Sequence, residues 1–340
     1  MTFQEKNGSN NNEMSQIEMA SIENLKTTTR GFELSCEFKN FPLTFVNALR
    51  RILLSSVPTV VVNDVEILKN TSQLPHEMLK HRVKMLPINV SPSDSATIKD
   101  AKIELRMLPD PAEGVKNVTT NDFVVESGRE ELILKDRDLG TPLLFLRLRQ
   151  NEEVHLKANL GVAVEGVSHL CNVSTSWHVD PERMKNDRKV WVEKGQDPRE
   201  FDNFEYQKSY AINEKGEPHW FDMSLESKGV LQAKDVLKLS VAILRKNVTD
   251  FMKEALDNIR RSEEKDTYVI SVANGGHTIG GLFQELLYSD MNVKYVGYDI
   301  RHPLKSDMDI PLVTDKTPES VLKSAKESIE EYCKLVEKAL

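Results

Sequence analysis

The 340-residue sequence has few cysteines, no long apolar run and no excess of positive charge. Its three cysteines, Cys36, Cys171 and Cys333, lie far apart, which argues against a metal site built on local cysteine pairs and favours buried, reduced thiols. No stretch approaches the roughly 20 apolar residues of a membrane helix. The net charge of −8 argues against a protein that mainly grips nucleic acid, because phosphate binding needs clustered lysine and arginine. We therefore expect neither a membrane protein nor a nucleic-acid clamp.

What is present fits a globular chain of about two domains. Hydrophobic residues make up 39% and charged residues 29% of the sequence. The first stretch, MTFQEKNGSNNNEMSQ, is polar and lacks an apolar core, so we expect no secretory signal and a disordered tail over residues 1–30.

A strand-helix-strand unit occurs twice in the chain. GFELSCEF alternates as a strand, LTFVNALRRILLSSV (43–57) has a helical apolar face, and TVVVNDVEIL is a second strand. A single shift of 234 positions (278 − 44) places DTYVISVANGGHTIGGLFQELLYSDMNVKYVGYDI beneath it without a gap. Thr44 then meets Thr278, and Leu49 meets Phe283. Such internal similarity predicts two related modules.

Each module is followed by a long helix with a narrow apolar seam. Apolar residues recur at steps of three and four, which is typical of helices that pack lengthwise on each other. We predict an intrachain interface formed by Val241, Leu244, Val248 and Phe251 of the first helix and Leu322, Ile329 and Val336 of the second.

These patterns predict an α+β fold in which two modules form an intrachain pseudo-dimer. The first module comprises 31–70 and 219–262, the second 266–340, and the interruption at 71–218 is an inserted domain. Alternating segments and turn residues in the insert predict mostly antiparallel sheet. Its charged part, DPERMKNDRKVWVEKGQDPREFDN, is interpreted as a surface loop.

The two modules differ on their exposed helix faces. Arg50 and Arg51 interrupt the apolar helix of the first module, where the second has Gln284 and Glu285. Adjacent arginines are either a solvated edge or a contact in which planar guanidinium groups bind a partner, and Asn47 belongs to one or the other.

Two further patterns bear on catalysis. Glu77, His81 and Arg82 have helical spacing, but no nucleophile or metal site accompanies them, so a role in fixing the insert or a partner is favoured. NGGHTIGG has no phosphate-loop spacing and is interpreted as a glycine-permitted turn. An enzyme using the turn at 275–281 is a rival hypothesis that would require nucleotide binding.

NALRRILLSSVPT with NTSQLPHEMLKHRVKMLPI resembles the alpha-type assembly subunits of multisubunit RNA polymerases. These are bacterial alpha, its archaeal D-type counterpart and the third-largest subunit of eukaryotic polymerase II. The matching residues are Asn47, Ala48, Leu49, Arg50, Arg51, Asn70, Thr71, Ser72, Glu77, His81, Arg82 and Pro87. FDMSLESKGVL resembles the segment in that family where the chain re-enters the dimerisation domain after the insert.

The second module resembles the small partner of those subunits, which is the archaeal L-type polypeptide or the eleventh subunit of polymerase II. The matching residues are His277, Thr278, Gly280, Gly297, Tyr298, His302 and Pro303, and the whole resemblance covers about 30–340. His76, Lys84 and Gly281 depart from the family patterns, and a glycine-rich stretch is only weakly visible at 161–173. The metal-binding cysteines of some relatives and the promoter-contacting domain of bacterial alpha are not expected here.

The resemblance implies a non-catalytic assembly platform without cofactor or metal. Implied partners are the second-largest and largest polymerase subunits and a small zinc-binding tenth subunit, with nucleic acid contacted only indirectly. The implied partner-binding residues are Asn47, Arg50, Arg51, Glu77 and Arg82. A free-standing interaction scaffold remains the alternative.

Fusion of the two partners in one chain resembles the arrangement in large DNA viruses of eukaryotes. It implies a chain that is not a homodimer and that is found in host-cell cytoplasm and virion, or alternatively in the nucleus.

Overall fold

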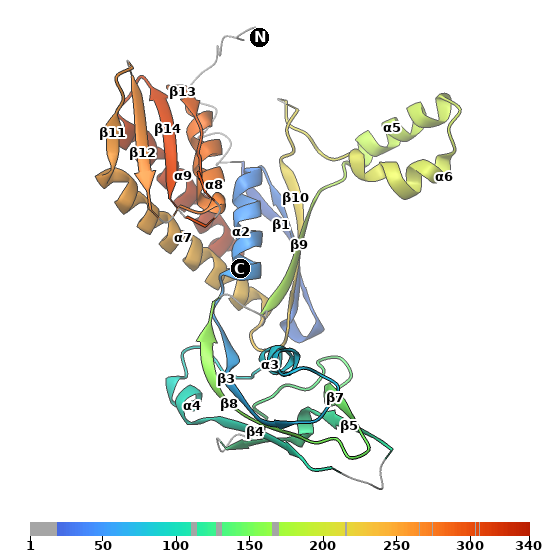
Figure 1. Cartoon of the computed structure of the whole chain (residues 1–340). Helices are drawn as coiled ribbons and strands as arrows, with labels where there is room; N and C mark the ends of the chain where they lie inside the picture. Colours follow the sequence, from blue (N-terminus) through green and yellow to red (C-terminus); the bar gives the residue numbers. More distant parts are fainter. Residues whose placement is uncertain are drawn as a thin grey trace.

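The computed structural model describes residues 19–109, 114–126, 131–164, 170–214, 216–264, 266–273, 275–302, 304–305 and 307–340. Figure 1 shows two helix-backed sheets side by side, a separate β-rich body below them and a helical arm that extends to one side. Residues 1–18 of the predicted tail, residues 165–169 of the weak glycine-rich match and Pro303 lie outside the described residues. No described helix has both the length and the apolar character needed to cross a membrane.

The first module is a four-stranded antiparallel sheet in the order β1-β2-β10-β9. Its strands are β1 (Ser21–Thr28), β2 (Glu33–Lys39), β9 (Cys171–Trp177) and β10 (Trp220–Ser227), and a 3-10 turn, η1 (Thr29–Gly31), joins β1 to β2. Helices α2 (Leu43–Ser55) and α7 (Ala233–Asp257) share a hydrophobic core with these strands. The prediction of a disordered tail is wrong for Ser21–Thr28, because these residues pair with β2 along its edge.

The second module repeats this architecture in the order β11-β12-β14-β13. Its elements are β11 (Ile259–Arg261), β12 (Thr267–Val272), α8 (His277–Ser289), β13 (Val293–Val296), β14 (Met308–Thr314) and α9 (Pro318–Ala339). Gly280 of α8 lies so close to the sheet side that an added Cβ would be 2.8 Å from both Met308 Sδ and Tyr298 Cδ2. Glycine is required there because its lack of a side chain lets α8 approach Met308 and Tyr298 closely.

The strand that follows α2 differs from the expectation. The shift of 234 positions made TVVVNDVEIL the equivalent of β13. That segment forms β3 (Thr59–Asn70), however, which pairs with β8 (Val154–Ala163) in the inserted domain. β9 occupies the place of β13, since both pair antiparallel with the strand that precedes the long helix. The module therefore takes a strand from 171–177 and gives up 59–70, in contrast to the predicted boundaries. Apolar alternation specifies a strand but not its sheet.

The inserted domain contains antiparallel sheets, as predicted. One has the order β3-β8-β4-β6, with β4 (Lys102–Met107) and β6 (Phe123–Glu126), and β5 (Val115–Thr119) pairs with β7 (Leu144–Arg149). Helices α3 (His76–Lys84) and α4 (Ser95–Asp100) and the 3-10 turn η2 (Thr120–Asp122) complete it. Its hydrophobic core is separate from that of the modules.

The charged segment after β9 is helical, so the prediction of a surface loop is wrong. It forms α5 (Pro181–Glu193), α6 (Pro198–Glu200), a π-helical turn η3 (Phe201–Glu205) and a 3-10 turn η4 (Tyr206–Lys208). The Asp180 side chain accepts from the backbone N–H groups of Glu182 and Arg183, and Pro181 takes the first helical position. Asp-Pro-Glu is a recognisable helix start, and the composition-based interpretation overlooked it.

One continuous core joins the two modules across α7 and α9. All seven residues predicted for the intrachain interface are buried in it. Aromatic rings bridge the modules: Phe251 and Phe283 have centroids 4.3 Å apart, and Tyr332 lies 5.4 Å from Phe45. All three cysteines are free and buried, and burial raises the pKa of Cys36 to about 12 and of Cys171 to about 11.

Candidate docking surface

Helix α2 presents a polar face opposite its buried residues. It begins after Pro42, and its inward face comprises Phe45, Val46, Ala48, Leu49, Ile52 and Leu53. Arg50 donates from Nε and Nη2 to Asn47 Oδ1, at 3.1 and 2.9 Å. This contact orients the guanidinium along the helix and uses two of its five N–H donors. A planar group held in one direction is suited to binding a carboxylate or carbonyl of another chain.

Arg51 makes a different contact, with the second module. Its Nε donates to Thr278 Oγ1 of α8 at 2.8 Å, although the side chain is exposed. The backbone N–H of Thr44 donates to Glu285 Oε2 at 3.0 Å. The two equivalent helices are thus linked through Arg51 and Glu285, which occupy the same place in the two modules (51 + 234). Arg51 therefore belongs at least in part to the intrachain interface, whereas Arg50 faces outward beside Asn47.

The other two predicted partner-binding residues lie on α3 in the inserted domain. Arg82 Nε donates to the backbone oxygen of Phe145 at 2.8 Å, which ties α3 to β7. Glu77 is 84% exposed and pairs with Lys80, three residues on. The five predicted residues thus fall on two separate elements, α2 and α3, and the contact of Arg82 is internal to the insert.

A groove of about 890 Å³ lies between α2, the end of β9 and the arm. Its lining includes Leu43, Val46 and Asn47 of α2, residues 175–177 at the end of β9, and Phe204, Tyr206, Gln207, Lys208 and Tyr210 of the arm. Three apolar side chains at this groove are exposed: Leu43 at 43%, Trp177 at 47% and Phe204 at 72%. Exposed aromatic rings grouped in a concave surface are typical of protein-binding sites.

The arm is held as a unit by contacts between its two halves. Arg188 donates to both carboxylate oxygens of Asp202, at 2.8 and 3.0 Å, and this interaction lowers the pKa of Asp202. Trp191 Nε1 donates to the Asp197 backbone oxygen at 3.1 Å. The helix α5 has no buried residue, and Val190 is 47% exposed. In Figure 1 the arm stands away from the sheets. The sequence patterns used above did not predict this surface. The several aromatic residues in 191–210 were a signal for it, because a solvated loop does not require large aromatic side chains.

The glycine-rich turn before α8 is explained by packing. An added Cβ at Gly275 would lie 2.5 Å from Met308 Cβ, so the glycine permits close approach of the turn to β14. His277, the first residue of α8, is exposed and makes an edge-on contact with Tyr298, with ring centroids 5.8 Å apart. The geometry favours a structural turn over a phosphate-binding loop.

The fold defines a class of protein: a chain that contains both halves of a pseudo-dimer and leaves a polar face of α2 exposed. Comparison with known families gives the same result. The sequence matches the RNA polymerase Rpb3/Rpb11 dimerisation domain over residues 35–248, and a second family of the same description over 267–339. The chain therefore belongs to the Rpb3/Rpb11 dimerisation-domain family, and it combines an alpha-like subunit with a second domain of the same kind.

Individual relatives agree with this assignment. The chain is 26% identical over 268 residues to DNA-directed RNA polymerase II subunit RPB3 of Schizosaccharomyces pombe, covering 69% of this chain and 86% of that protein. It is 26% identical over 239 residues to DNA-directed RNA polymerase subunit Rpo3 of Thermococcus kodakarensis, covering 62% and 88%. Rpo3 of Methanocaldococcus jannaschii is 30% identical over 144 residues, covering 42% and 68%. The predicted resemblance is confirmed, and the family agrees with the prediction of a non-catalytic subunit.

Proposed function

We propose that this chain is the non-catalytic assembly subunit of a DNA-directed RNA polymerase and that the outer face of α2 receives the second-largest subunit. The observation that carries the proposal is the pairing of two dimerisation modules within one chain through a common core. Pairing in cis uses the facing surfaces of α7 and α9 and the side of α2 that contacts α8, so further partners bind elsewhere.

The docking face is asymmetric. Asn47 and Arg50 of α2 correspond to Gly281 and Gln284 of α8 after the shift of 234 positions (47 + 234 and 50 + 234). Only the first module therefore carries an oriented guanidinium at this place. A single large partner can then bind in one direction on a scaffold that is otherwise nearly two-fold.

The adjoining groove supplies the apolar part of the contact. Its exposed Leu43, Trp177 and Phe204 line the same groove as Asn47, which accepts from the Arg50 guanidinium, so an apolar anchor lies near an oriented charge. Such a combination is typical of interfaces in which a few residues dominate the binding energy.

The proposal extends to partners and origin. We assign the largest subunit and a small tenth-subunit-like chain as further companions by analogy with the RNA polymerase relatives. The fusion of both modules in one chain supports a virus-encoded apparatus located in host-cell cytoplasm and virion.

The test is co-expression of the full chain with the second-largest subunit encoded by the same genome, followed by affinity purification. The wild-type chain is expected to retain that subunit, and Arg50→Ala to lose it, because removal of a charged partner at a buried contact costs about 2–5 kcal/mol. Arg147→Ala, which removes an exposed arginine on β7, is the matched control. Circular dichroism checks folding.

Full recovery of the second-largest subunit by a folded Arg50→Ala chain would remove Arg50 from the docking face. Failure of the wild-type chain to bind any polymerase subunit would favour a free-standing scaffold.

A further inference from the structure

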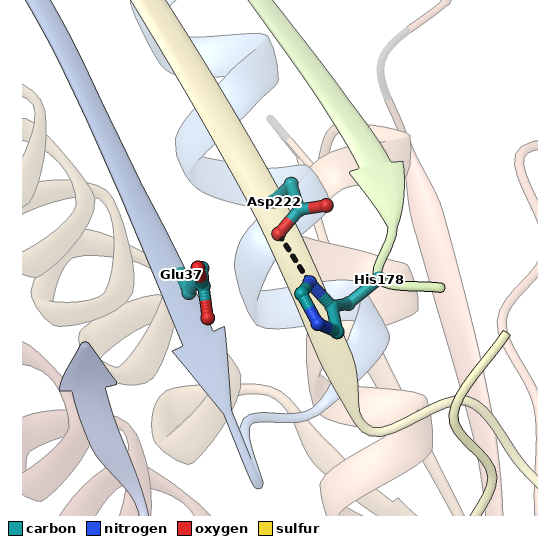
Figure 2. Close-up of side chains that lie close together, drawn as sticks. All are labelled: Glu37, His178 and Asp222. Atoms are coloured by element: carbon teal, nitrogen blue, oxygen red, sulfur yellow. Dashed lines mark hydrogen bonds and ion pairs between the residues drawn. The ribbon is translucent and has the colours of Figure 1, made fainter. Parts of the chain in front are cut away.

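Three chemically distinct side chains meet on the outer face of the first module's sheet. Glu37 lies on β2, Asp222 on β10, and His178 directly follows β9. Figure 2 shows His178 and Asp222 joined by a hydrogen bond, with Glu37 beside them on the neighbouring strand β2. They are far apart in sequence, so no local sequence motif predicts that they meet. Only the strand order brings them together.

Their ligand atoms are close enough to share one ion. One atom from each residue lies within 4.8 Å of the other two. His178 Nδ1 and Asp222 Oδ1 are 2.8 Å apart. Three ligands about 2.1 Å from a tetrahedral ion are about 3.4 Å from one another, so a small movement of the Glu37 side chain would complete the set.

Trp220 holds two of the three groups in place. Its indole Nε1 donates to Glu37 Oε2 at 3.2 Å, and Asn24 Nδ2 donates to Glu37 Oε1 at 2.8 Å. The His178 ring stacks on Trp220 with centroids 4.0 Å apart and planes 15° apart. Neighbours that fix the orientation of potential ligands reduce the entropic cost of gathering them around an ion.

The electrostatics of the sheet favour a cation at this point. Asp222 and Glu37 are direct cross-strand partners, and like charges directly opposite each other destabilise a sheet. The His178 side chain is 21% exposed and that of Asp222 is 44% exposed, so solvent screens them only in part. A cavity of about 320 Å³ opens over the three groups, and its lining includes the hydroxyl-bearing Ser35 and Ser176 and the competing cation Lys26.

We propose that Glu37, His178 and Asp222 form a binding site for a divalent transition-metal ion of the zinc class. One imidazole nitrogen with two carboxylate oxygens suits Zn²⁺, whereas Mg²⁺ and Ca²⁺ prefer oxygen ligands alone. The ion takes the position of the proton shared by His178 and Asp222. Three protein ligands leave a coordination position for water or for a side chain of another subunit.

The inserted domain offers a matched comparison. His155 Nε2 lies 2.7 Å from Glu104 Oε1, so it has the same histidine–carboxylate contact. The third group there is Lys157, 3.8 Å from Glu104, in place of a second carboxylate. Both clusters thus contain a histidine–carboxylate hydrogen bond. Of the two, only the cluster on the module sheet adds a second carboxylate that could bind a cation.

The experiment is calorimetric titration of the full-length, metal-depleted chain with ZnCl₂, with MgCl₂ as the selectivity control. One equivalent of Zn²⁺ is expected to bind. Asp222→Asn, Glu37→Gln and His178→Gln should each weaken this binding by at least about tenfold. His155→Gln should leave it unchanged. Thermal unfolding gives an independent readout, since Zn²⁺ should raise the Tm of the wild type more than that of each of the three site variants.

Absorption spectra of the Co²⁺-substituted chain identify the ligands. Bands of a nitrogen–oxygen site without sulfur-to-metal charge transfer support the assignment, because the cysteines are buried in the core. No Zn²⁺ binding by the folded wild type, binding that survives all three substitutions, or a thiolate band would each overturn it.

Discussion

Leu244→Ala should destabilise the joint core of the two modules far more than Leu239→Ala, although both residues lie on α7. Leu244 is fully buried, at 0% exposure, whereas Leu239 is 39% exposed. Both variants change the same residue type in the same helix, so the difference between their unfolding free energies measures the contribution of burial in the seam.

The magnitude follows from the atoms removed. Truncation of leucine to alanine deletes three carbons, and each buried carbon contributes about 0.8 kcal/mol of transfer free energy. A further penalty arises from the cavity, and comparable buried substitutions cost about 2–5 kcal/mol in total. At the exposed position the change in unfolding free energy should stay within about 0.5 kcal/mol.

Tryptophan fluorescence during urea unfolding is a suitable assay. The three tryptophans, Trp177, Trp191 and Trp220, lie on β9, α5 and β10, outside the core of the inserted domain. Their signal therefore follows the module core and the arm without a contribution from tryptophan in the insert. We expect a lower unfolding midpoint for Leu244→Ala and a nearly unchanged one for Leu239→Ala.

Equal destabilisation by the two variants would refute the reasoning, since it would mean that burial on the α7 seam does not govern stability. A loss below about 1 kcal/mol at Leu244 would do the same. Circular dichroism of both variants in buffer establishes that they begin from the same fold.

Three further predictions concern assembly and pH. The isolated full chain should be monomeric by light scattering, because the modules pair in cis; a stable symmetric dimer with an unpaired second module would contradict this. Co-expressed fragments 1–262 and 263–340 should associate. Ile329→Asp should prevent this association, because an unpaired carboxylate would enter the seam at a cost of several kcal/mol. Continued co-purification of the two fragments would place the seam elsewhere. Burial and the nearby Lys39 ammonium lower the pKa of His219 below its ordinary 6.5, so the unfolded chain takes up a proton that the folded chain resists. Stability should therefore fall as the pH decreases through about 6.5, and His219→Gln should reduce that fall in unfolding midpoints measured between about pH 7.5 and 5.5, whereas an unchanged pH profile would exclude His219 as the cause.

Local sequence patterns were enough to specify the repeated modules and the apolar seam. Both depend on short periods: helices repeat every 3.6 residues, strands every two, and a shift of 234 positions superimposes the two patterns. The burial of Leu49 in α2 and of Phe283 in α8 follows from that pattern alone. Helix starts are equally local, and the arm helix could have been predicted from Asp180 and Pro181.

The choice of sheet for each strand, and the meeting of distant side chains, came from the three-dimensional fold instead. β3 and β9 both alternate apolar residues, yet β3 joined the insert and β9 the first module, because pairing depends on competition among edges across the whole chain. The contact of Arg51 with Thr278 and the cluster of Glu37, His178 and Asp222 arise in the same way. Each requires a register between segments far apart in sequence, and a pattern with a period of a few residues carries no information about that register.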